Sequence, residues 1–423
     1  QDLMGWTNNS LRVQATSLTW GSDGSVAGAA ARTPQRDRAA RGQPAIVPGG
    51  LPTIRGMTQA DILVRGAGAV GLAAALALSR QGRSVALLHS APPAVDDVRA
   101  YALNAASVRL LATLKVWDAI PADARTAVHD MHVAGDAAGA ALDFSAWTQG
   151  VSELAWIVDA AELERALRTA ARFAPHLQEV AAPVPAALTV LAEGKDSVTR
   201  DALGVKMPRH AYGQRGIAAR LLSPVPHNGL ARQWFRSPDV LALLPLDRPQ
   251  PGQGLGLVWS VPDARADELM ALPDADFLAE LMHATGGAAG TLTLASARAQ
   301  WPLALAHAER VVGPGWVLIG DAAHVVHPLA GQGLNLGLAD VQVLAEELAA
   351  CEPWRGLGDP KLLARYARRR VIPTRAMAQV TDGLLHLFAS PQPLVRELRN
   401  RGLSLVNQLP PLKRLLTGRA LGG

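Results

Sequence analysis

A glycine-rich turn between a strand and a helix is the feature that most constrains this fold. The apolar residues 62–64 predict a buried strand that ends at Arg65, and Gly66, Gly68 and Gly71 follow it in the pattern G-x-G-x-x-G. A helix and then a second strand are predicted over residues 71–88. A lone motif of this kind is weak evidence, but inside a βαβ unit of roughly 30 residues it strongly indicates dinucleotide binding. The three glycines then provide the tight turn, the close approach to a pyrophosphate and the packing of helix on strand.

The second strand of such a unit usually ends in a carboxylate that binds the adenosine ribose, and here that position is His89. A neutral imidazole can still accept a hydrogen bond from a ribose hydroxyl. The alternative is a strand-end side chain that faces solvent and has no role. The sequence leaves both interpretations of His89 open.

A second glycine-rich turn lies late in the chain, between residues 320 and 340. The apolar run 316–319 predicts a strand that ends at Gly320 and Asp321, and a helical pattern begins near Leu334. The turn between strand and helix contains Pro328, Gly331 and Gly333. Backbone N–H groups and the helix dipole at such a turn favour an anionic or electron-rich ligand, and glycine lets the backbone approach it closely.

The stretch 320–340 resembles the second FAD-binding motif of the flavin-dependent aromatic hydroxylases, in particular the branch that hydroxylates polyprenyl phenols in ubiquinone biosynthesis. The resemblance implies that Asp321 hydrogen-bonds the ribityl chain of FAD. It also implies that the backbone around residues 333–335 contacts the pyrimidine side of the isoalloxazine, where the helix dipole would stabilise negative charge on the reduced flavin. The cofactor-binding residues predicted from this stretch are Gly320, Asp321, Pro328, Gly331, Gly333, Leu334 and Asn335.

Two further positions bear on the cofactor. Residues 97–107 resemble the family segment whose arginine reaches the FAD pyrophosphate, a role that carries over to Arg99. Arginine suits this role because it binds phosphate through two hydrogen bonds and stays charged; the alternative is a solvated arginine at a helix start. Glu193 stands where the family has the aspartate of a Gly-Ala-Asp-Gly motif near the pyrophosphate. Its longer side chain shifts the charge, so direct NAD(P)H binding is not inferred from it.

The resemblance covers residues 57–423 and implies an α/β fold: a discontinuous Rossmann-like FAD-binding domain, an antiparallel β-sheet substrate domain and C-terminal helices. The predicted limits are 57–200 and 313–350 for the FAD-binding domain, 201–312 for the substrate domain and 351–423 for the helical region. Residues 1–56 lack a repeating apolar pattern and are interpreted as a leader or an overextended start.

Local patterns fill in these regions. Alternating apolar residues and turn residues predict short antiparallel strands between 212 and 261, and a further strand at 292–299. Helical periodicity predicts C-terminal helices at 362–370, 377–388 and 394–406.

The composition restricts the function classes. No run approaches the roughly 18 apolar residues needed to span a bilayer. A single cysteine, Cys351, excludes an internal disulfide framework and fits a reducing compartment, so a cytoplasmic protein is expected. Residues 1–56 contain six Arg and three Asp, and residues 391–423 contain six Lys or Arg and one Glu, so the remainder carries −3 of the formal net charge of +5. With the positive charge at the two ends and only eight Tyr or Phe, nucleic-acid binding is not expected.

A metal site is not expected either. His324 and His327 form an H-x-x-H pair, but no third ligand accompanies them in the sequence.

The resemblance implies an oxygen-dependent hydroxylase. Reduced FAD would trap O2 as a C4a-hydroperoxide whose distal oxygen attacks an electron-rich phenol, while the protein supplies orientation and a dry cavity. The substrate would be a prenylated aromatic, and NAD(P)H would supply electrons directly or through a reductase. No residue is predicted as a catalytic acid or base.

Two alternatives remain at this stage. One is a same-fold FAD oxidoreductase that acts on another small molecule. The other is a degenerate flavoprotein that serves as a scaffold in a biosynthetic complex, a hypothesis motivated by His89 and Glu193. A membrane-borne substrate and the basic C-terminal segment also leave open a peripheral contact with the inner membrane.

Overall fold

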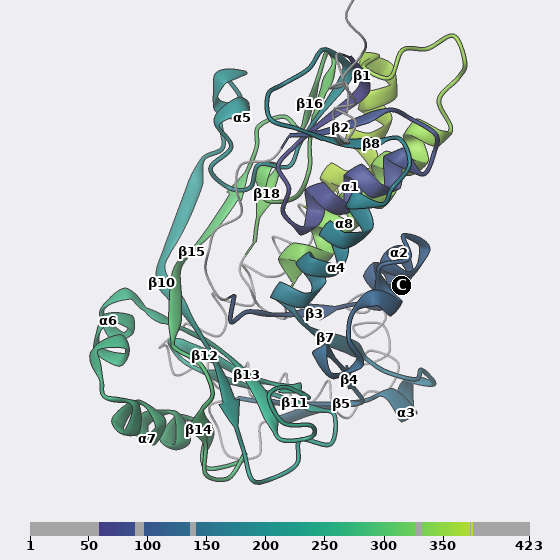
Figure 1. The fold of residues 1–423 in the computed structure, drawn as a ribbon. Coiled ribbons are helices and arrows are strands. Elements are labelled where there is room, and N and C mark those ends of the chain that lie inside the picture. The colour runs from purple at the N-terminus through teal and green to yellow at the C-terminus, as the bar shows by residue number, and fades with distance from the viewer. Residues whose placement is uncertain (1–58, 89–96, 136–140, 327–331, 373, 375–423) are drawn as a thin grey trace, which may run out of the picture. The chain divides into compact units, whose positions relative to one another are not determined.

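The computed structural model describes residues 59–88, 97–135, 141–326, 332–372 and 374. The chain divides into two units, residues 1–54 and 55–423, and every described residue belongs to the second. The strands of these residues form three sheets, with helices packed beside them (Figure 1).

A six-stranded sheet carries the first glycine motif, in the strand order β16-β17-β9-β1-β2-β8. All neighbouring strands run parallel except β16, which pairs antiparallel with β17. Ile62, Leu63 and Val64 of the interior strand β1 are buried on both faces of the sheet, as expected for a parallel strand covered by helices. The bounds are β1 (Ala60–Arg65), β2 (Val85–Leu88), β8 (Leu177–Val180), β9 (Ala186–Leu191), β16 (Val312–Gly313) and β17 (Trp316–Leu318).

The helix that follows β1 is nearly all apolar and lies inside the unit. Helix α1 (Ala69–Ser79) packs against both α4 (Ala160–Arg172) and α8 (Gln332–Ala349), and Figure 1 shows α1 and α8 side by side. Almost every residue of α1 is buried, which is typical of a helix that is hydrophobic all round. Its alanines keep the side chains short enough for two helices to pack against it.

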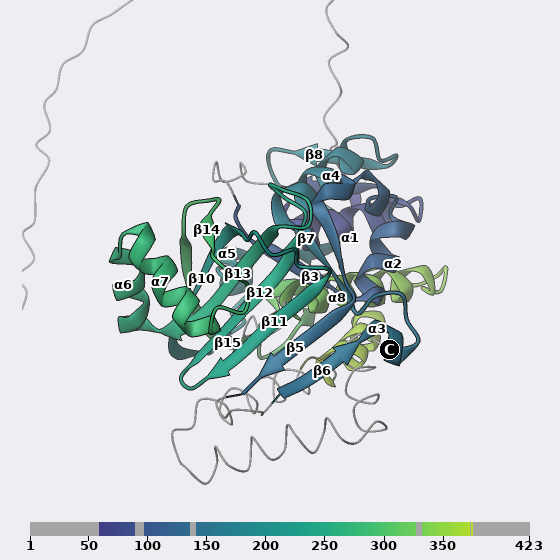
Figure 2. The ribbon, with the colours of Figure 1, turned by 90° about the horizontal axis from the view of Figure 1, so that it is seen from below.

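A nine-stranded sheet follows the order β18-β15-β10-β13-β12-β11-β5-β6, with β14 paired to β10 (Figure 2). Only the pair β5–β11 is parallel, so the predicted antiparallel sheet is confirmed. Helices α6 (Asp263–Ala271) and α7 (Asp274–Thr285) pack on it over a core that includes Trp259 and Phe277. The strands are β5 (Asp130–Ala134), β6 (Ala141–Ser145), β10 (Arg209–Leu222), β11 (Leu230–Arg236), β12 (Asp239–Leu246), β13 (Gly254–Pro262), β14 (Thr293–Leu294), β15 (Ala299–His307) and β18 (His324–Val325).

The third sheet is small and antiparallel, with the order β3-β7-β4. Its strands are β3 (Ala100–Leu103), β4 (Arg125–Val128) and β7 (Ala155–Asp159). The remaining elements are α2 (Ala105–Thr113), α3 (Ala146–Gln149), α5 (Val198–Ala202) and the 3-10 turns η1 (Trp117–Ala119), η2 (Ala122–Ala124) and η3 (Gly320–Ala322).

Two sequence-based expectations can be compared directly with these elements. The strand predicted at 292–299 is observed only in part, because residues 293–294 form β14 and the long strand β15 begins at Ala299. Pro302 obscured this strand; it pairs with Arg215 next to a register shift, an irregularity of the kind at which a sheet tolerates proline. The helix predicted at 362–370 is observed over residues 360–372, whereas those at 377–388 and 394–406 lie outside the described residues.

Candidate functional site

The turn between β1 and α1 is shaped by three glycines with different tasks. Gly66 has φ +105°, and a Cβ there would lie 2.3 Å from the carbonyl oxygen of Ala192, at the end of β9. A Cβ on Gly71 would lie 1.9 Å from the carbonyl oxygen of Gly66. Packing inside the protein therefore requires glycine at these two positions.

Gly68 is different, because no neighbouring atom explains it. It caps the N-terminus of α1 in an extended conformation with a negative φ, and a Cβ there would have no atom of the described structure within 4 Å. The missing side chain leaves open space in front of the first turn of α1, where backbone N–H groups and the helix dipole favour an anion. The turn therefore fits a pyrophosphate.

The second glycine turn meets the first helix. Gly320 follows β17 at the start of η3 and has φ +59°, and a Cβ on it would lie 3.2 Å from Val70 in the first turn of α1. A Cβ on Gly337 of α8 would lie 2.6 Å from the same Val70 and 3.3 Å from the Cα of Gly320. These close approaches bring together the starts of α1 and α8 and the turn at Asp321, although about 250 residues separate them in the sequence.

Asp321, in η3, lies where a carboxylate can meet a polar ligand. Its side chain is accessible to water, yet the surrounding protein still raises the pKa of the carboxyl above its ordinary value. Partial desolvation is the main cause, and nearby His324, Arg99 and Lys195 oppose it. An accessible carboxylate of this kind can accept hydrogen bonds from the hydroxyl groups of a bound chain.

The N-terminus of α8 is fixed by the side chain of Asn335. Its carbonyl oxygen accepts hydrogen bonds from the Asn104 backbone N–H (3.0 Å) and the Ser107 hydroxyl (2.7 Å), and its amide donates to the Ala102 carbonyl (2.7 Å). The buried amide thus joins α8 to β3 and α2 and sets the direction in which the helix start points. A Cβ on Gly333 would meet open space, as at Gly68. Leu334 is half-buried against the core, and the predicted residues Pro328 and Gly331 lie outside the described residues.

Arg99 precedes β3 and forms a two-pronged ion pair with Asp97, at 2.8 Å and 2.7 Å. This pair raises the pKa of Arg99. Burial raises the pKa of Asp97, but the hydrogen bonds and charge of Arg99 outweigh burial, so the pKa of Asp97 is lowered overall. The backbone of Arg99 is held in turn by Arg220, which donates to the Arg99 carbonyl (2.6 Å) and pairs with Asp159 (2.9 Å). Because Asp97 accepts from both Nε and Nη2 of Arg99, a phosphate at this place would compete with Asp97 for these donors.

Glu193 has a clear structural task. Its carboxylate accepts hydrogen bonds from Arg65 (2.8 Å), from the Ser197 hydroxyl (2.7 Å), and from both the hydroxyl (2.7 Å) and the N–H (3.1 Å) of Thr199. It therefore joins the ends of β1 and β9 to the start of α5. Burial raises its pKa, but these hydrogen bonds outweigh burial and the pKa is lowered overall. His89, the other departure from the family pattern, lies outside the described residues.

Asp340 is a residue that the sequence analysis missed. It lies on α8, is almost completely buried, and accepts a hydrogen bond from the Gly320 N–H (2.9 Å) while facing His324 Nε2 at 2.7 Å. Burial raises its pKa, but His324 and Arg370 lower it further than burial raises it. The available signal was an ionisable residue on the apolar face of the predicted helix, between Leu338 and Val341.

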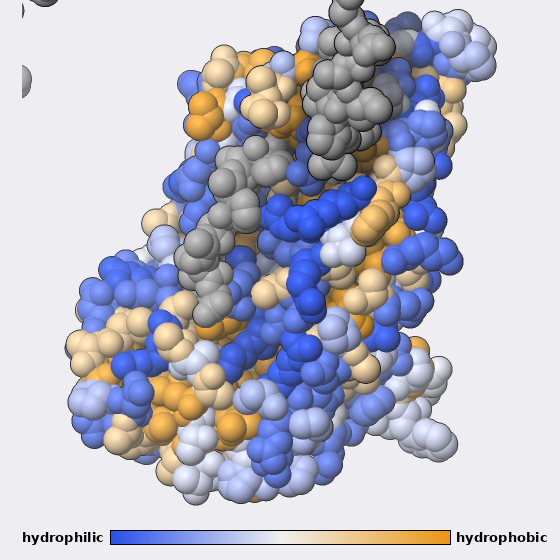
Figure 3. All heavy atoms as spheres, in the orientation of Figure 1, coloured by the Kyte–Doolittle hydropathy of each residue, from blue (hydrophilic) through white to orange (hydrophobic). Residues whose placement is uncertain are grey.

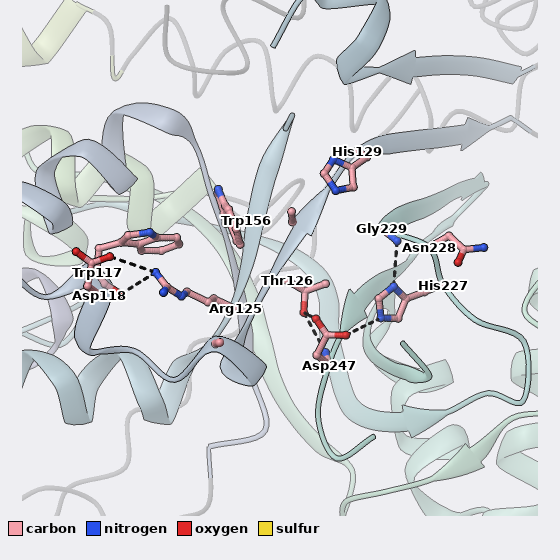
Figure 4. A pocket seen from close by; sticks show the side chains of 12 residues that line it. Trp117, Asp118, Arg125, Thr126, His129, Trp156, His227, Asn228, Gly229 and Asp247 are labelled. Atoms are coloured by element: carbon pink, nitrogen blue, oxygen red, sulfur yellow. Dashed lines mark hydrogen bonds and ion pairs between the residues drawn. The ribbon is translucent and has the colours of Figure 1, made fainter. Parts of the chain in front are cut away.

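A cavity of about 690 Å³ lies away from these residues, beside β4 (Figure 4). Its walls include Trp117, Arg125 and Trp156, with His227 and Asp247 opposite. Trp117 and Trp156 meet edge to face with ring centroids 5.2 Å apart, and Arg125 covers the Trp117 ring at 4.9 Å. None of the predicted cofactor residues lines this cavity, so it is not the candidate cofactor site.

Two searches of the described residues bear on other site types. No group of three or more His, Cys, Asp or Glu in this part of the chain could hold a metal ion, and His327 lies outside it. No helix among the same residues is long and apolar enough to cross a membrane.

Residues 59–182 and 168–381 match the family described as FAD binding domain. The chain belongs to this family and is an FAD-dependent monooxygenase. Among its relatives, the ubiquinone hydroxylase UbiL of Rhodospirillum rubrum is 33% identical, over 86% of this chain and 90% of the relative. The 3-demethoxyubiquinol 3-hydroxylase of Escherichia coli is 31% identical, over 86% of this chain and 98% of the relative.

The fold is shared with solved structures as well. The crystal structure of p-nitrophenol 4-monooxygenase PnpA from Pseudomonas putida superposes with a TM-score of 0.70 at 18% identity, covering 87% of this chain and 99% of that one. The predicted family, the α/β fold class and the FAD cofactor are thereby confirmed. The individual cofactor-binding residues stay predictions.

The lowered pKa of Glu193 makes a prediction about stability and pH. Because the carboxyl has a lower pKa folded than unfolded, it stabilises the fold above the ordinary pKa of 4.5 and loses this effect as the pH falls through the folded value. We expect Glu193→Gln to lower the free energy of unfolding by about 2 kcal/mol at pH 7 and by progressively less below about pH 4.5. Urea unfolding at several pH values measures this difference.

The matched control is Glu309→Gln, at an exposed glutamate, which should change the free energy of unfolding by less than about 0.5 kcal/mol at every pH. A Glu193→Gln difference that stays constant from pH 7 to pH 3 would contradict the role assigned to the carboxylate.

Proposed function

We propose that this chain hydroxylates the aromatic ring of a prenylated phenol in ubiquinone biosynthesis, using FAD, O2 and electrons from NAD(P)H. The observation that carries the proposal is the convergence of the two glycine turns and the start of α8 around Asp321, in a chain that spans nearly the whole length of relatives named as ubiquinone hydroxylases. The alternative of a scaffold without cofactor is not favoured, because Glu193 is accounted for by its own hydrogen bonds.

The roles of the residues follow from their positions. The open N-terminus of α1 at Gly68 would hold the pyrophosphate, with Gly66 and Gly71 shaping the turn. Arg99 would add a permanent positive charge there. Asp321 would accept hydrogen bonds from the ribityl hydroxyls, and the start of α8 would direct its dipole toward the pyrimidine side of the flavin. We include Gly320, Pro328, Gly331 and Gly333–Asn335 in this site.

When bound, FAD supplies the activation of O2 and accepts the electrons. The net reaction converts NAD(P)H, a proton, O2 and the aromatic C–H into NAD(P)+, water and the phenolic C–OH. No described side chain is assigned as an acid or base, so the protein's contribution is binding, orientation and exclusion of water.

The substrate side of the site is expected from the nine-stranded sheet. Strand β18 continues directly from the turn at Asp321 and pairs with β15, with Ala306 opposite Val325 and His307 opposite His324. The segment that follows the turn at Asp321 is therefore hydrogen-bonded to this sheet. We assign substrate binding to residues 201–312 and cofactor binding to 57–200 with 313–350.

The first test is the cofactor and product. We expect the purified chain to carry about one FAD and to convert a short-chain polyprenyl phenol into a product that is heavier by one oxygen atom, with NAD(P)H or a reductase present. Visible spectroscopy, identification of the released cofactor and mass spectrometry with 18O2 check this. A protein that binds no FAD even after reconstitution would refute the proposal, whereas FAD binding without hydroxylation would favour an oxidoreductase on another molecule.

Gly68 and Gly71 provide a matched pair of variants. Gly68→Ala places a methyl group in the open space before α1, so FAD affinity should fall at least tenfold with the unfolding of the apoprotein changed by less than about 0.5 kcal/mol. Gly71→Ala instead overlaps the Gly66 carbonyl and should lower the free energy of unfolding by about 3 kcal/mol. Flavin fluorescence titration and urea unfolding separate the two effects. If Gly68→Ala binds FAD with unchanged affinity, the assignment of the pyrophosphate to this turn is wrong.

A membrane contact completes the proposal. A prenylated substrate partitions into lipid, and residues 391–423 carry six Lys or Arg against one Glu. On the face shown in Figure 3, apolar residues lie among polar ones at the lower left. We expect the chain to sediment with anionic vesicles at low salt and to remain in solution with neutral ones. Equal sedimentation with both kinds of vesicle, or with neither, would argue against electrostatic membrane contact.

A further inference from the structure

The helix over residues 360–372 lies outside every predicted cofactor motif, yet it contacts Asp340, the buried carboxylate that binds the turn at Asp321. Arg370, on the helix over residues 360–372, donates from Nε to Asp340 Oδ1 at 2.6 Å and from Nη2 to the Leu336 carbonyl at 3.0 Å. One turn earlier on the same helix, the Tyr366 hydroxyl donates to the Leu318 carbonyl, the last residue of β17, at 3.1 Å. Asp340, Tyr366 and Arg370 are all buried.

The two oxygens of Asp340 face in different directions. Oδ1 binds Arg370, and Oδ2 binds the Gly320 N–H and His324 Nε2. The carboxylate of Asp340 thus connects the helix over residues 360–372 to Gly320 and His324, which lie on either side of Asp321 in the sequence. A buried carboxylate is retained only if a partner compensates its charge, so removing Arg370 would leave Asp340 uncompensated and free to draw away from Gly320 and His324.

His324 extends the chain of contacts toward the site. Its Nε2 faces Asp340, whereas its Nδ1 is buried and has no hydrogen-bond partner among the described residues. Because Nε2 faces a carboxylate that only accepts, the hydrogen bond requires the Nε2–H form of the ring. Asp340 therefore sets the orientation of a ring that lies close enough to Asp321 to lower the pKa of its carboxyl.

We propose that Arg370 is a positioning residue for the flavin: through Asp340 it fixes Gly320 and His324, and so the carboxylate of Asp321. The helix over residues 360–372 is then part of the cofactor site although it need not touch the cofactor. This inference rests on the proposed function, because it assumes that the turn at Asp321 holds FAD.

The chain offers a control next to the residue itself. Arg369 also forms two ion pairs, with Glu347 at 2.9 Å and Glu346 at 2.6 Å, but its side chain is 46% exposed, against 9% for Arg370. Arg369→Met and Arg370→Met therefore remove the same kind of side chain from adjacent positions, one at the surface and one behind the turn. Surface pairs of this kind contribute little to stability.

The experiment measures the dissociation constant of FAD by quenching of flavin fluorescence, with the full chain freed of cofactor and at a temperature where each variant is folded by circular dichroism. Arg370→Met should raise the dissociation constant at least tenfold, and Arg369→Met should leave it within twofold of the original. Asp340→Asn should raise it as well. The double variant should bind no more than about twofold more weakly than the weaker single variant, because the two residues act as one unit.

A purely structural role predicts a different pattern. Arg370→Met would then lower the unfolding temperature of the apoprotein but leave the dissociation constant unchanged in the folded protein, which would overturn the inference. If Arg370→Met does not fold, Arg370→Lys decides the question: a single ammonium keeps the charge but lacks the fork that reaches both Asp340 and the Leu336 carbonyl, so we expect a severalfold weaker affinity. If the folded Arg370→Lys variant binds FAD as tightly as the unmodified chain, the inference is also overturned.

Failure of the proposed function is distinguishable from failure of this inference. If the unmodified chain itself binds no FAD, the proposed function falls and the inference falls with it. If the unmodified chain binds FAD and the Arg370 variants bind it equally well, only the positioning role is lost.

Discussion

The carboxylate of Asp340 is the interaction on which the candidate site depends. It is buried, and it bonds at once to the turn after β17, to β18 and to the helix over residues 360–372. A buried charge of this kind is costly unless it is paired and hydrogen-bonded, and here Arg370, Gly320 and His324 provide the partners. The buried hydrogen bonds and ion pairs of Asp340 thus fix the geometry of the turn, while the side chain of Asp321 remains accessible to solvent.

The second constraint comes from glycines, which have no Cβ atom. Gly66, Gly71 and Gly337 let β9, α1 and the β17 turn approach within distances that a side chain would forbid. Gly68 and Gly333 do the opposite and leave open space at the starts of two helices. The first group builds the fold and the second leaves room for a ligand, so the same residue type serves packing and binding at neighbouring positions.

The departures from the family pattern have physical explanations where the structure describes them. The carboxylate of Glu193 accepts hydrogen bonds from Arg65, Ser197 and Thr199. The glutamate therefore connects the end of β9 to the start of α5. Arg99, which matches the family pattern, forms its ion pair with Asp97, two positions earlier in the sequence. The sequence could identify Glu193 as an important position, but it could not show that Glu193 pairs with Arg65, 128 positions earlier in the chain.

The sequence alone determined the βαβ unit, the antiparallel sheet, the cofactor class and the two glycine turns, because each depends on residues close together along the chain. Only the tertiary structure showed that Asn335 orients α8 through Asn104 and Ser107, and that Asp340 and Arg370 support the turn at Gly320. Asn335 and Asn104 are 231 positions apart in the sequence. A hydrogen bond across such a distance leaves no periodic or local signal, because its geometry exists only after strands and helices have packed.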